Sequence, residues 1–175
     1  MRLKDYIGKR REDYEGVALK NAVARDALAT ATGNPDLSVA QAADYRIAVE
    51  TAISCVTDDD KRIRVSTLYP DWESGNHAVG DIYNAAGQTW ECYQAYDNAI
   101  YPDINPEQAA WYTFNRPLHG KTPETARPWV TPTGAHDIYK SGEHTVFTDG
   151  KLYKCKQDTN FSPAEYASAW EEVGE

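Results

Sequence analysis

One short motif occurs twice in this chain. The copies begin at Gly80 and Gly142 and end at Gln94 and Gln157. Each contains Gly, an acidic residue, a short apolar stretch and a second Gly, followed after two residues by aromatic-x-Cys-x-Gln, and the copies differ by one residue before the second Gly. Self-similarity in a fixed order is typical of duplicated structural units. The motif therefore limits the chain to folds that contain the same small unit twice.

Each copy predicts a β-hairpin. Asp149-Gly150 is a strong turn signal between alternating apolar and polar residues, and Ala86-Gly87 holds the same place less clearly in the first copy. Tyr, Trp, Val and Thr dominate the flanks, as on a half-buried pleated surface. Cys92 and Cys155 match between the copies. These equivalent positions suggest that Cys92 and Cys155 are small buried core residues. The odd count of three cysteines with no close spacing argues against a disulfide scaffold or a metal site.

Other matched residues extend this prediction. Asp81 and Glu143 occupy the same position, which indicates a role in a turn or cap rather than in catalysis. A module of about 45 residues lacks room for a large aliphatic core, so aromatic residues must fill it. The aromatic residues that we expect in the two cores are Trp90, Trp111, Tyr153 and Trp170.

The N-terminal part has a helical pattern. Residues 2–31 have apolar residues at three-to-four spacing, and Gly33-Asn34-Pro35 ends this helix. A second helix begins with Asp36 or Ser38 as N-cap and continues to position 56, before three consecutive Asp residues. Such a hairpin buries little surface alone, so we expect it to form a homo-oligomer or to dock on a partner. The alternative is a monomeric hairpin packed on the first β module.

These patterns predict an α+β multidomain chain, with an N-terminal helical hairpin followed by two small antiparallel β modules. The hairpin takes residues 1–60, and residues 61–65 form a strand or linker. The first module takes 66–114 and the second 129–175. Residues 115–128 hold three Pro and one Gly, which favours a semi-rigid linker.

The order of residues around each motif resembles the chitin-binding type 3 module, which covers carbohydrate-binding module families five and twelve. Both matching stretches, 69–114 and 128–174, have an upstream Trp, a Tyr or His before Gly-acid, Gly-x-x-aromatic-x-Cys and a closing Trp. His77 stands where the family usually has Tyr, Glu143 replaces Asp, and residues 95–105 are a longer insertion.

The resemblance implies that exposed aromatic rings bind the apolar faces of sugar rings while polar groups bind the hydroxyls. The ligand-binding residues that it indicates are Trp72, Tyr93, Tyr96 and Tyr101 in the first module, and Trp129, Tyr139 and Phe161 in the second. Each of these rings has core packing as its alternative role.

Composition and motifs argue against several other functions. A net charge of −9 disfavours a nucleic-acid partner. The chain has no apolar run near 18 residues and no apolar segment at its start, so we expect neither a membrane helix nor a signal peptide. It lacks HExxH, CxxC, Gly-x-Ser-x-Gly and Gly-rich phosphate-loop motifs. We therefore expect no enzymatic activity, no metal and no cofactor, and we interpret His77, His119, His136 and His144 as scattered.

These observations lead to a hypothesis of a non-catalytic, adhesin-like carbohydrate-binding protein of a bacteriophage virion, released by lysis. A tail fibre, baseplate appendage or head decoration fits, with residues 1–60 binding other virion proteins. The two tandem modules would bind a chitin-like, cell-wall, capsule or mucus polysaccharide. The first alternative is a structural tail or head assembly protein whose modules contact other virion subunits. The second is a binding subunit of a cell-wall hydrolase.

Overall fold

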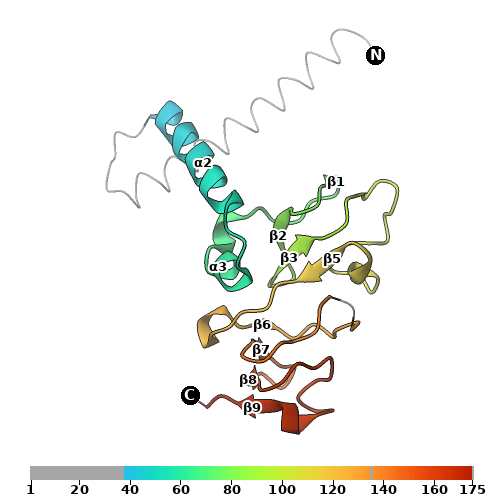
Figure 1. Ribbon diagram of the computed structural model, residues 1–175. Helices are drawn as coiled ribbons and strands as arrows, with labels where there is room; N and C mark the ends of the chain where they lie inside the picture. The colour runs from blue at the N-terminus through green and yellow to red at the C-terminus, as the bar shows by residue number, and fades with distance from the viewer. Residues whose placement is uncertain (1–37, 135, 175) are drawn as a thin grey trace. The chain divides into compact units, whose positions relative to one another are not determined.

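The computed structural model describes residues 38–134 and 136–174 (Figure 1). The chain divides into two compact units, Met1–Cys55 and Val56–Glu175. Helices and several small, mainly antiparallel sheets make up the described residues, which agrees with the predicted α+β class. The first helix of the predicted hairpin, residues 2–31, lies outside the described residues.

Helix α2, Val39–Ser54, is the described part of the first unit. Ser38 is its N-cap: the Ser38 hydroxyl accepts from the Gln41 backbone N–H at 3.2 Å, and the Gln41 side chain accepts from the Ser38 N–H at 3.0 Å. This reciprocal pair satisfies two amides that the first turn leaves without helical partners. The predicted second helix is therefore confirmed, with Ser38 as its cap. No helix among the described residues is long and apolar enough to cross a membrane.

Helix α3, Asp59–Arg64, corrects the prediction of a strand or linker at residues 61–65. The Asp58 carboxylate accepts from the Lys61 N–H at 3.0 Å and caps the helix. Two Asp residues lie in its first turn and three basic residues in its last, an order that complements the helix dipole. The run of three Asp residues, which we interpreted as a stop, is the start of a new helix.

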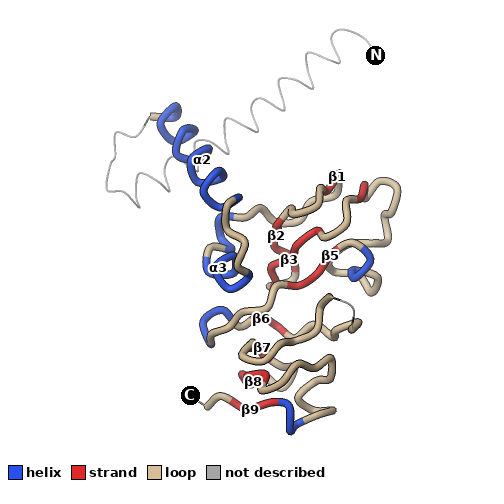
Figure 2. The backbone as a smooth tube through the Cα atoms, in the orientation of Figure 1, coloured by secondary structure: helices blue, strands red, loops and turns tan. Residues whose placement is uncertain are grey.

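The second unit contains three sheets of short strands, connected by long loops (Figure 2). Their orders are β1-β4, β2-β3-β5 and β6-β7-β8-β9, and all pairs except β6-β7 are antiparallel. The strands of the first module are β1 Asn76–His77, β2 Ile82–Ala85, β3 Gln88–Cys92, β4 Tyr96–Asp97 and β5 Asn115–Pro117. Those of the second are β6 Arg127–Pro128, β7 His144–Val146, β8 Leu152–Cys155 and β9 Trp170–Glu172. The short 3-10 helices are Ser66–Leu68, Trp111–Thr113, Pro123–Thr125 and Ala167–Ala169.

Both predicted hairpins are present. Strands β2 and β3 are joined by Ala86 and Gly87, whose φ values of +51° and +74° belong to the two-residue turn that matches the twist of paired strands. Strands β7 and β8 are joined around Gly150, which has φ +81° and donates to the Phe147 carbonyl at 2.9 Å. The duplicated motif thus forms the same local structure twice.

Equivalent backbone hydrogen bonds occur within each of the two hairpins. The Gly80 N–H donates to the Cys92 carbonyl and the Gly142 N–H to the Cys155 carbonyl, both at 2.8 Å. Each Cys is fully buried and lies opposite the last strand of its module. Burial raises the pKa of both thiols to about 11, which fits the predicted core role.

The matched acidic residues close matched turns. The Asp81 carboxylate accepts from the Ala78 N–H at 2.7 Å, and the Glu143 carboxylate from the Lys140 N–H at 2.8 Å. Both residues therefore have the predicted turn-capping role. We call this set of matched backbone and cap hydrogen bonds the shared frame.

Residues 115–128 are not a spacer, in contrast to the prediction. Their first three residues form β5, Leu118 is fully buried, and His119 and Thr125 are buried as well. The Asp60 carboxylate of α3 accepts from the Lys121 N–H at 2.8 Å and from the Thr125 hydroxyl at 2.5 Å. The connection between the modules is thus packed between α3 and both sheets.

The positions of the three prolines explain why the composition of residues 115–128 wrongly predicted a linker. Pro117 lies in β5, Pro123 opens a 3-10 helix, and Pro128 lies in the edge strand β6. A helix start and a sheet edge leave the N–H unused, so Pro costs little there. A Pro-rich composition alone does not separate such packed positions from a linker.

The buried side chains gather in three clusters. The first contains Trp90 and the second Trp170, as predicted, with 2% and 4% of their surface exposed. Tyr153 and Trp111, also predicted as core, pack at the margins of these clusters. A third cluster contains Ile63, Ile82 and Leu118, and it joins α3 to the β2-β3-β5 sheet.

Candidate functional site

Four aromatic side chains of the second unit are largely exposed, and they lie in the same connection of the two modules. This connection runs from the hairpin to the last strand, from β3 through β4 to β5 in the first module and from β8 to β9 in the second. The exposed fractions are 45% for Tyr101, 45% for Tyr112, 53% for Phe161 and 41% for Tyr166. Each module thus presents two aromatic rings at its surface.

Tyr101 extends from a well-fixed loop. The buried Asn98 side chain donates to the Tyr101 carbonyl at 3.0 Å and to the Ile104 carbonyl at 3.2 Å. The Tyr101 ring rests against the buried Phe114, with centroids 5.1 Å apart. The loop therefore holds this ring at the surface with one side supported, an arrangement that costs little entropy on binding.

Phe161 and Tyr166 form the corresponding pair in the second module. Their rings meet edge to face at 6.4 Å. The Trp170 indole N–H donates to the Phe161 carbonyl at 3.0 Å, and the Gln157 amide donates to the Tyr166 hydroxyl at 3.0 Å. Exposed polar side chains, including Gln157 and Asn160, surround the pair. An apolar ring pair with a polar rim is a chemistry that suits a carbohydrate.

Two of the predicted binding residues are core residues instead. Tyr139 is 1% exposed, because its ring lies between Trp129 at 4.7 Å and His119 at 3.8 Å, and burial raises its pKa to about 12. Tyr96 is 6% exposed and stacks on Phe114 at 4.6 Å. Neither ring presents a face to solvent. In so small a module the rings nearest the shared frame fill the core.

Three further predicted residues are half-buried. Trp72 packs against the first cluster and its indole N–H donates to the Tyr96 hydroxyl at 3.0 Å, while Trp129 packs against the second cluster. The Tyr93 hydroxyl donates to the Thr113 carbonyl at 2.9 Å. Of the predicted residues, Tyr101 and Phe161 are therefore the ones that are exposed.

Tyr112 and Tyr166 escaped the sequence analysis. Each stands three or four residues before the first residue of its module's last strand, β5 or β9. A comparison of the two segments that precede these strands would have found an aromatic residue in both. The resemblance drew attention to the upstream Trp and the motif instead.

A polar cleft of about 780 Å³ lies between α3, β5 and residues 136–143. Its charged groups largely neutralise each other: Arg116 pairs with Asp59 at 2.8 Å, and Lys121 lies 3.5 Å from Asp58. Burial alone would lower the pKa of Arg116, but hydrogen bonds and charge from Asp59 and Glu91 raise it. These charges hold the segments of the unit together, so the cleft is a weaker candidate than the aromatic surface.

Titratable groups near the cleft are also engaged in the fold. His119 Nδ1 lies 3.0 Å from the Glu143 carboxylate, and both side chains are buried. Over residues 38–134 and 136–174, no three His, Cys, Asp or Glu side chains converge as metal ligands.

No family model matches this chain, and a search of curated proteins finds no match.

Proposed function

We propose that the protein is a non-catalytic carbohydrate-binding protein that binds a chitin-like polysaccharide through the exposed rings of its two modules. The observation that carries the proposal is the repeated placement of exposed aromatic residues in one connection of both modules, Tyr101 and Tyr112 in the first and Phe161 and Tyr166 in the second. The resemblance of the motif to chitin-binding type 3 modules supports it.

The chemistry of these rings fits a sugar polymer. Pyranose rings have flat faces of C–H groups, and an exposed Tyr or Phe covers such a face while nearby polar groups bind hydroxyls. Tyr101 and Tyr166 add a hydroxyl at the ring edge, and Gln157 and Asn160 provide amide donors and acceptors beside Phe161. Two weak sites on one chain gain avidity from their effective concentration.

A virion component with residues 1–60 as its anchor remains part of this proposal. Helix α2 belongs to a unit separate from the modules, and it has exposed apolar side chains, Tyr45 and Ile47 among them. Exposed apolar residues on a separate helical unit suit contacts with other subunits or with further copies of this chain.

The test is adsorption to insoluble chitin and to bacterial cell walls. We expect wild-type protein to be retained and the Tyr101→Ala, Phe161→Ala double variant to be lost to the supernatant. The control is Tyr45→Ala, which removes a Tyr of similar exposure, 50%, from α2 and should leave retention unchanged. If the wild type is retained on no polymer, the structural alternative, in which the modules contact virion subunits, replaces the proposal.

A further inference from the structure

The two modules meet in a ring contact at their junction. The Tyr93 ring of the first module lies against the His136 ring of the second, with centroids 4.0 Å apart. The Tyr93 hydroxyl donates to the carbonyls of Tyr112 and Thr113. His136 is exposed, it also lines the polar cleft, and Tyr93 links its ring to the backbone of the Tyr112 segment.

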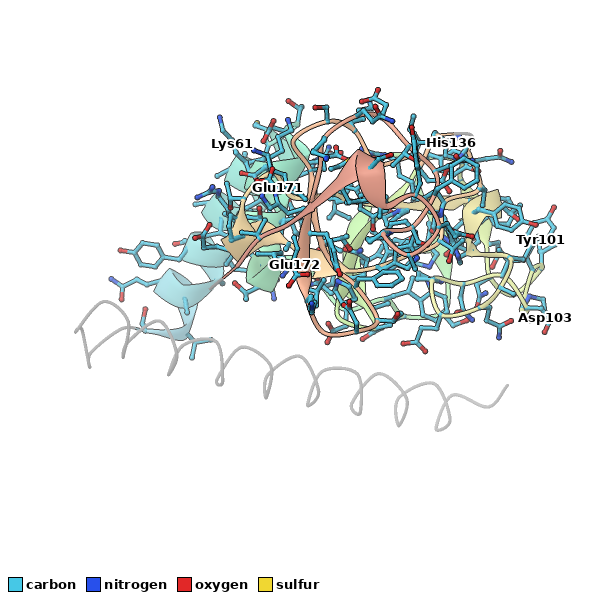
Figure 3. All side chains as sticks on the ribbon, turned by 90° about the horizontal axis from the view of Figure 1, so that it is seen from below. Lys61, Tyr101, Asp103, His136, Glu171 and Glu172 are labelled. Carbon is cyan, nitrogen blue, oxygen red and sulfur yellow. The ribbon has the colours of Figure 1, made fainter. Side chains whose placement is uncertain are left out.

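The loop that carries His136 also approaches the segment of the second aromatic pair at Asn160. The loop that carries His136 is fixed by Asp137, whose carboxylate accepts from the N–H groups of Thr133 and Gly134 at 2.5 and 3.0 Å. A Cβ atom added at Gly134 would lie 3.5 Å from the side-chain nitrogen of Asn160, the residue before Phe161. The β4–β5, β6–β7 and β8–β9 connections lie on one side of the unit in Figure 1, and Figure 3 shows Tyr101 and His136 toward the same end.

The junction between the modules is packed rather than flexible. Val130 packs against the first core cluster, while its neighbour Trp129 packs against the second. The Gln88 side chain donates to the Pro128 carbonyl at 3.4 Å, and Arg127 donates to the Ser66 hydroxyl at 2.8 Å. The spacing between the two ring pairs is therefore set by the fold and not by a linker.

We propose that Tyr101, Tyr112, His136, Phe161 and Tyr166 form one continuous surface, the aromatic track, that binds a single extended polysaccharide chain across both modules. This inference rests on the proposed function and deepens it, because it makes the ligand a polymer long enough to contact two modules at once. A fixed spacing avoids the ordering cost of a flexible tether, so the second contact adds to affinity almost fully.

The test is calorimetric titration of the full chain with soluble N-acetylglucosamine oligomers, from the dimer upward. We expect one oligomer per protein for the long ligands, and an affinity that rises at least about tenfold once the oligomer reaches both modules. His136→Ala and, separately, Phe161→Ala should remove this gain while the weak binding of short oligomers to the first module remains. Ile100→Ala, which removes a 68% exposed apolar side chain beside Tyr101, is the matched control and should keep the gain.

The other outcomes separate this inference from the proposed function. Two equal, independent sites for oligomers of every length would overturn the aromatic track and leave carbohydrate binding intact. Retention on the insoluble polymer without binding of any oligomer would also overturn it. Absence of both oligomer binding and polymer retention would overturn the track and the proposed function together.

Discussion

The two modules have the same frame but complete their cores differently. His77 and Tyr139 occupy matched positions, and both stack on the Trp that precedes them, at 5.8 Å from Trp72 and 4.7 Å from Trp129. On its other side His77 meets Tyr96 of its own module at 4.8 Å. Tyr139 instead meets a residue of the connection between the modules, His119, at 3.8 Å.

This difference shows which features of the repeat fix the fold. The shared frame consists of backbone hydrogen bonds and acidic caps. It therefore tolerates either His77 or Tyr139 at the matched position that stacks on the upstream Trp. In the first module the His77 ring packs on Tyr96 of the same module, although Val130 of the second module also contacts that core. In the second module the Tyr139 ring packs on His119 of the connection. The second module is therefore not an independent domain on a tether, and five substitutions test this asymmetry.

The largest effect is expected at Gly120, in the connection that supplies His119. A Cβ atom there would lie 2.1 Å from the Thr125 carbonyl oxygen, and backbone at both ends leaves little room for adjustment. We expect Gly120→Ala to lower the free energy of unfolding by about 4 kcal/mol or to prevent folding. Urea denaturation and soluble yield measure this. Gly75→Ala, where no atom lies within 4 Å, is the control, and similar stability of the two variants would contradict the packed connection.

Removal of the Tyr139 ring should lower the free energy of unfolding more than removal of the matched His77 ring. Tyr139→Ala leaves a cavity between two rings, and we expect a loss of about 3–5 kcal/mol in the free energy of unfolding. His77→Ala removes a half-exposed ring from the matched position, with an expected loss of about 1 kcal/mol. Equal losses in thermal or urea unfolding would show that the two cores are equivalent after all.

The attachment of α3 should depend on pH. Burial opposes ionisation of Asp60, but hydrogen bonds from Thr125, Lys121 and Arg64 outweigh it and lower the pKa of Asp60 below its ordinary 3.8. The ionised Asp60 side chain therefore stabilises the folded state above pH 3.8, and this stabilisation is lost as the pH falls through the lowered pKa. At neutral pH we expect Asp60→Ala to cost about 2 kcal/mol.

Urea unfolding of wild type and Asp60→Ala at several pH values tests this pH dependence. The difference between wild type and Asp60→Ala in urea unfolding should shrink as the pH falls below 3.8. A difference that stays constant down to acid pH would argue that Asp60 acts through packing rather than charge. Asp103→Asn, an exposed carboxylate away from α3, controls for the general effect of charge.

The smallest effect is expected at a surface ion pair of the second module. Lys151 lies 2.8 Å from Glu172, and the matched positions of the first module carry Gln88 and Pro117. Because both partners are about half exposed, solvent screens their attraction. Lys151→Ala should leave the unfolding midpoint unchanged within error, and a clear shift would give this pair a role in the asymmetry.

Local features were predictable from the sequence, and distant contacts were not. The hairpin turns, the Ser38 cap, the turn-capping Asp81 and Glu143, and the buried cysteines depend on neighbouring residues, and each prediction is confirmed. The packing of residues 115–128 depends on α3, about 60 residues earlier in the chain, which composition does not reveal.

The candidate site shows the same limit. The resemblance pointed to Tyr101 and Phe161, and both rings are exposed in the structure. It also selected Tyr96 and Tyr139, because a sequence does not show which of many rings the small core uses. Tyr112 and Tyr166 could have been found by comparing the segments before β5 and β9, whereas His136 becomes a candidate only through the fold, which places its ring against Tyr93.

We propose that one exposed aromatic surface, and not the buried rings, binds polysaccharide. Heteronuclear NMR of the full chain during titration with a soluble N-acetylglucosamine oligomer tests it most directly. We expect the signals of Tyr101, Tyr112, His136, Phe161 and Tyr166 to shift together with one binding curve, while those of buried Tyr139 stay in place. Shifts confined to one module, or an absence of shifts at these five residues, would contradict the account.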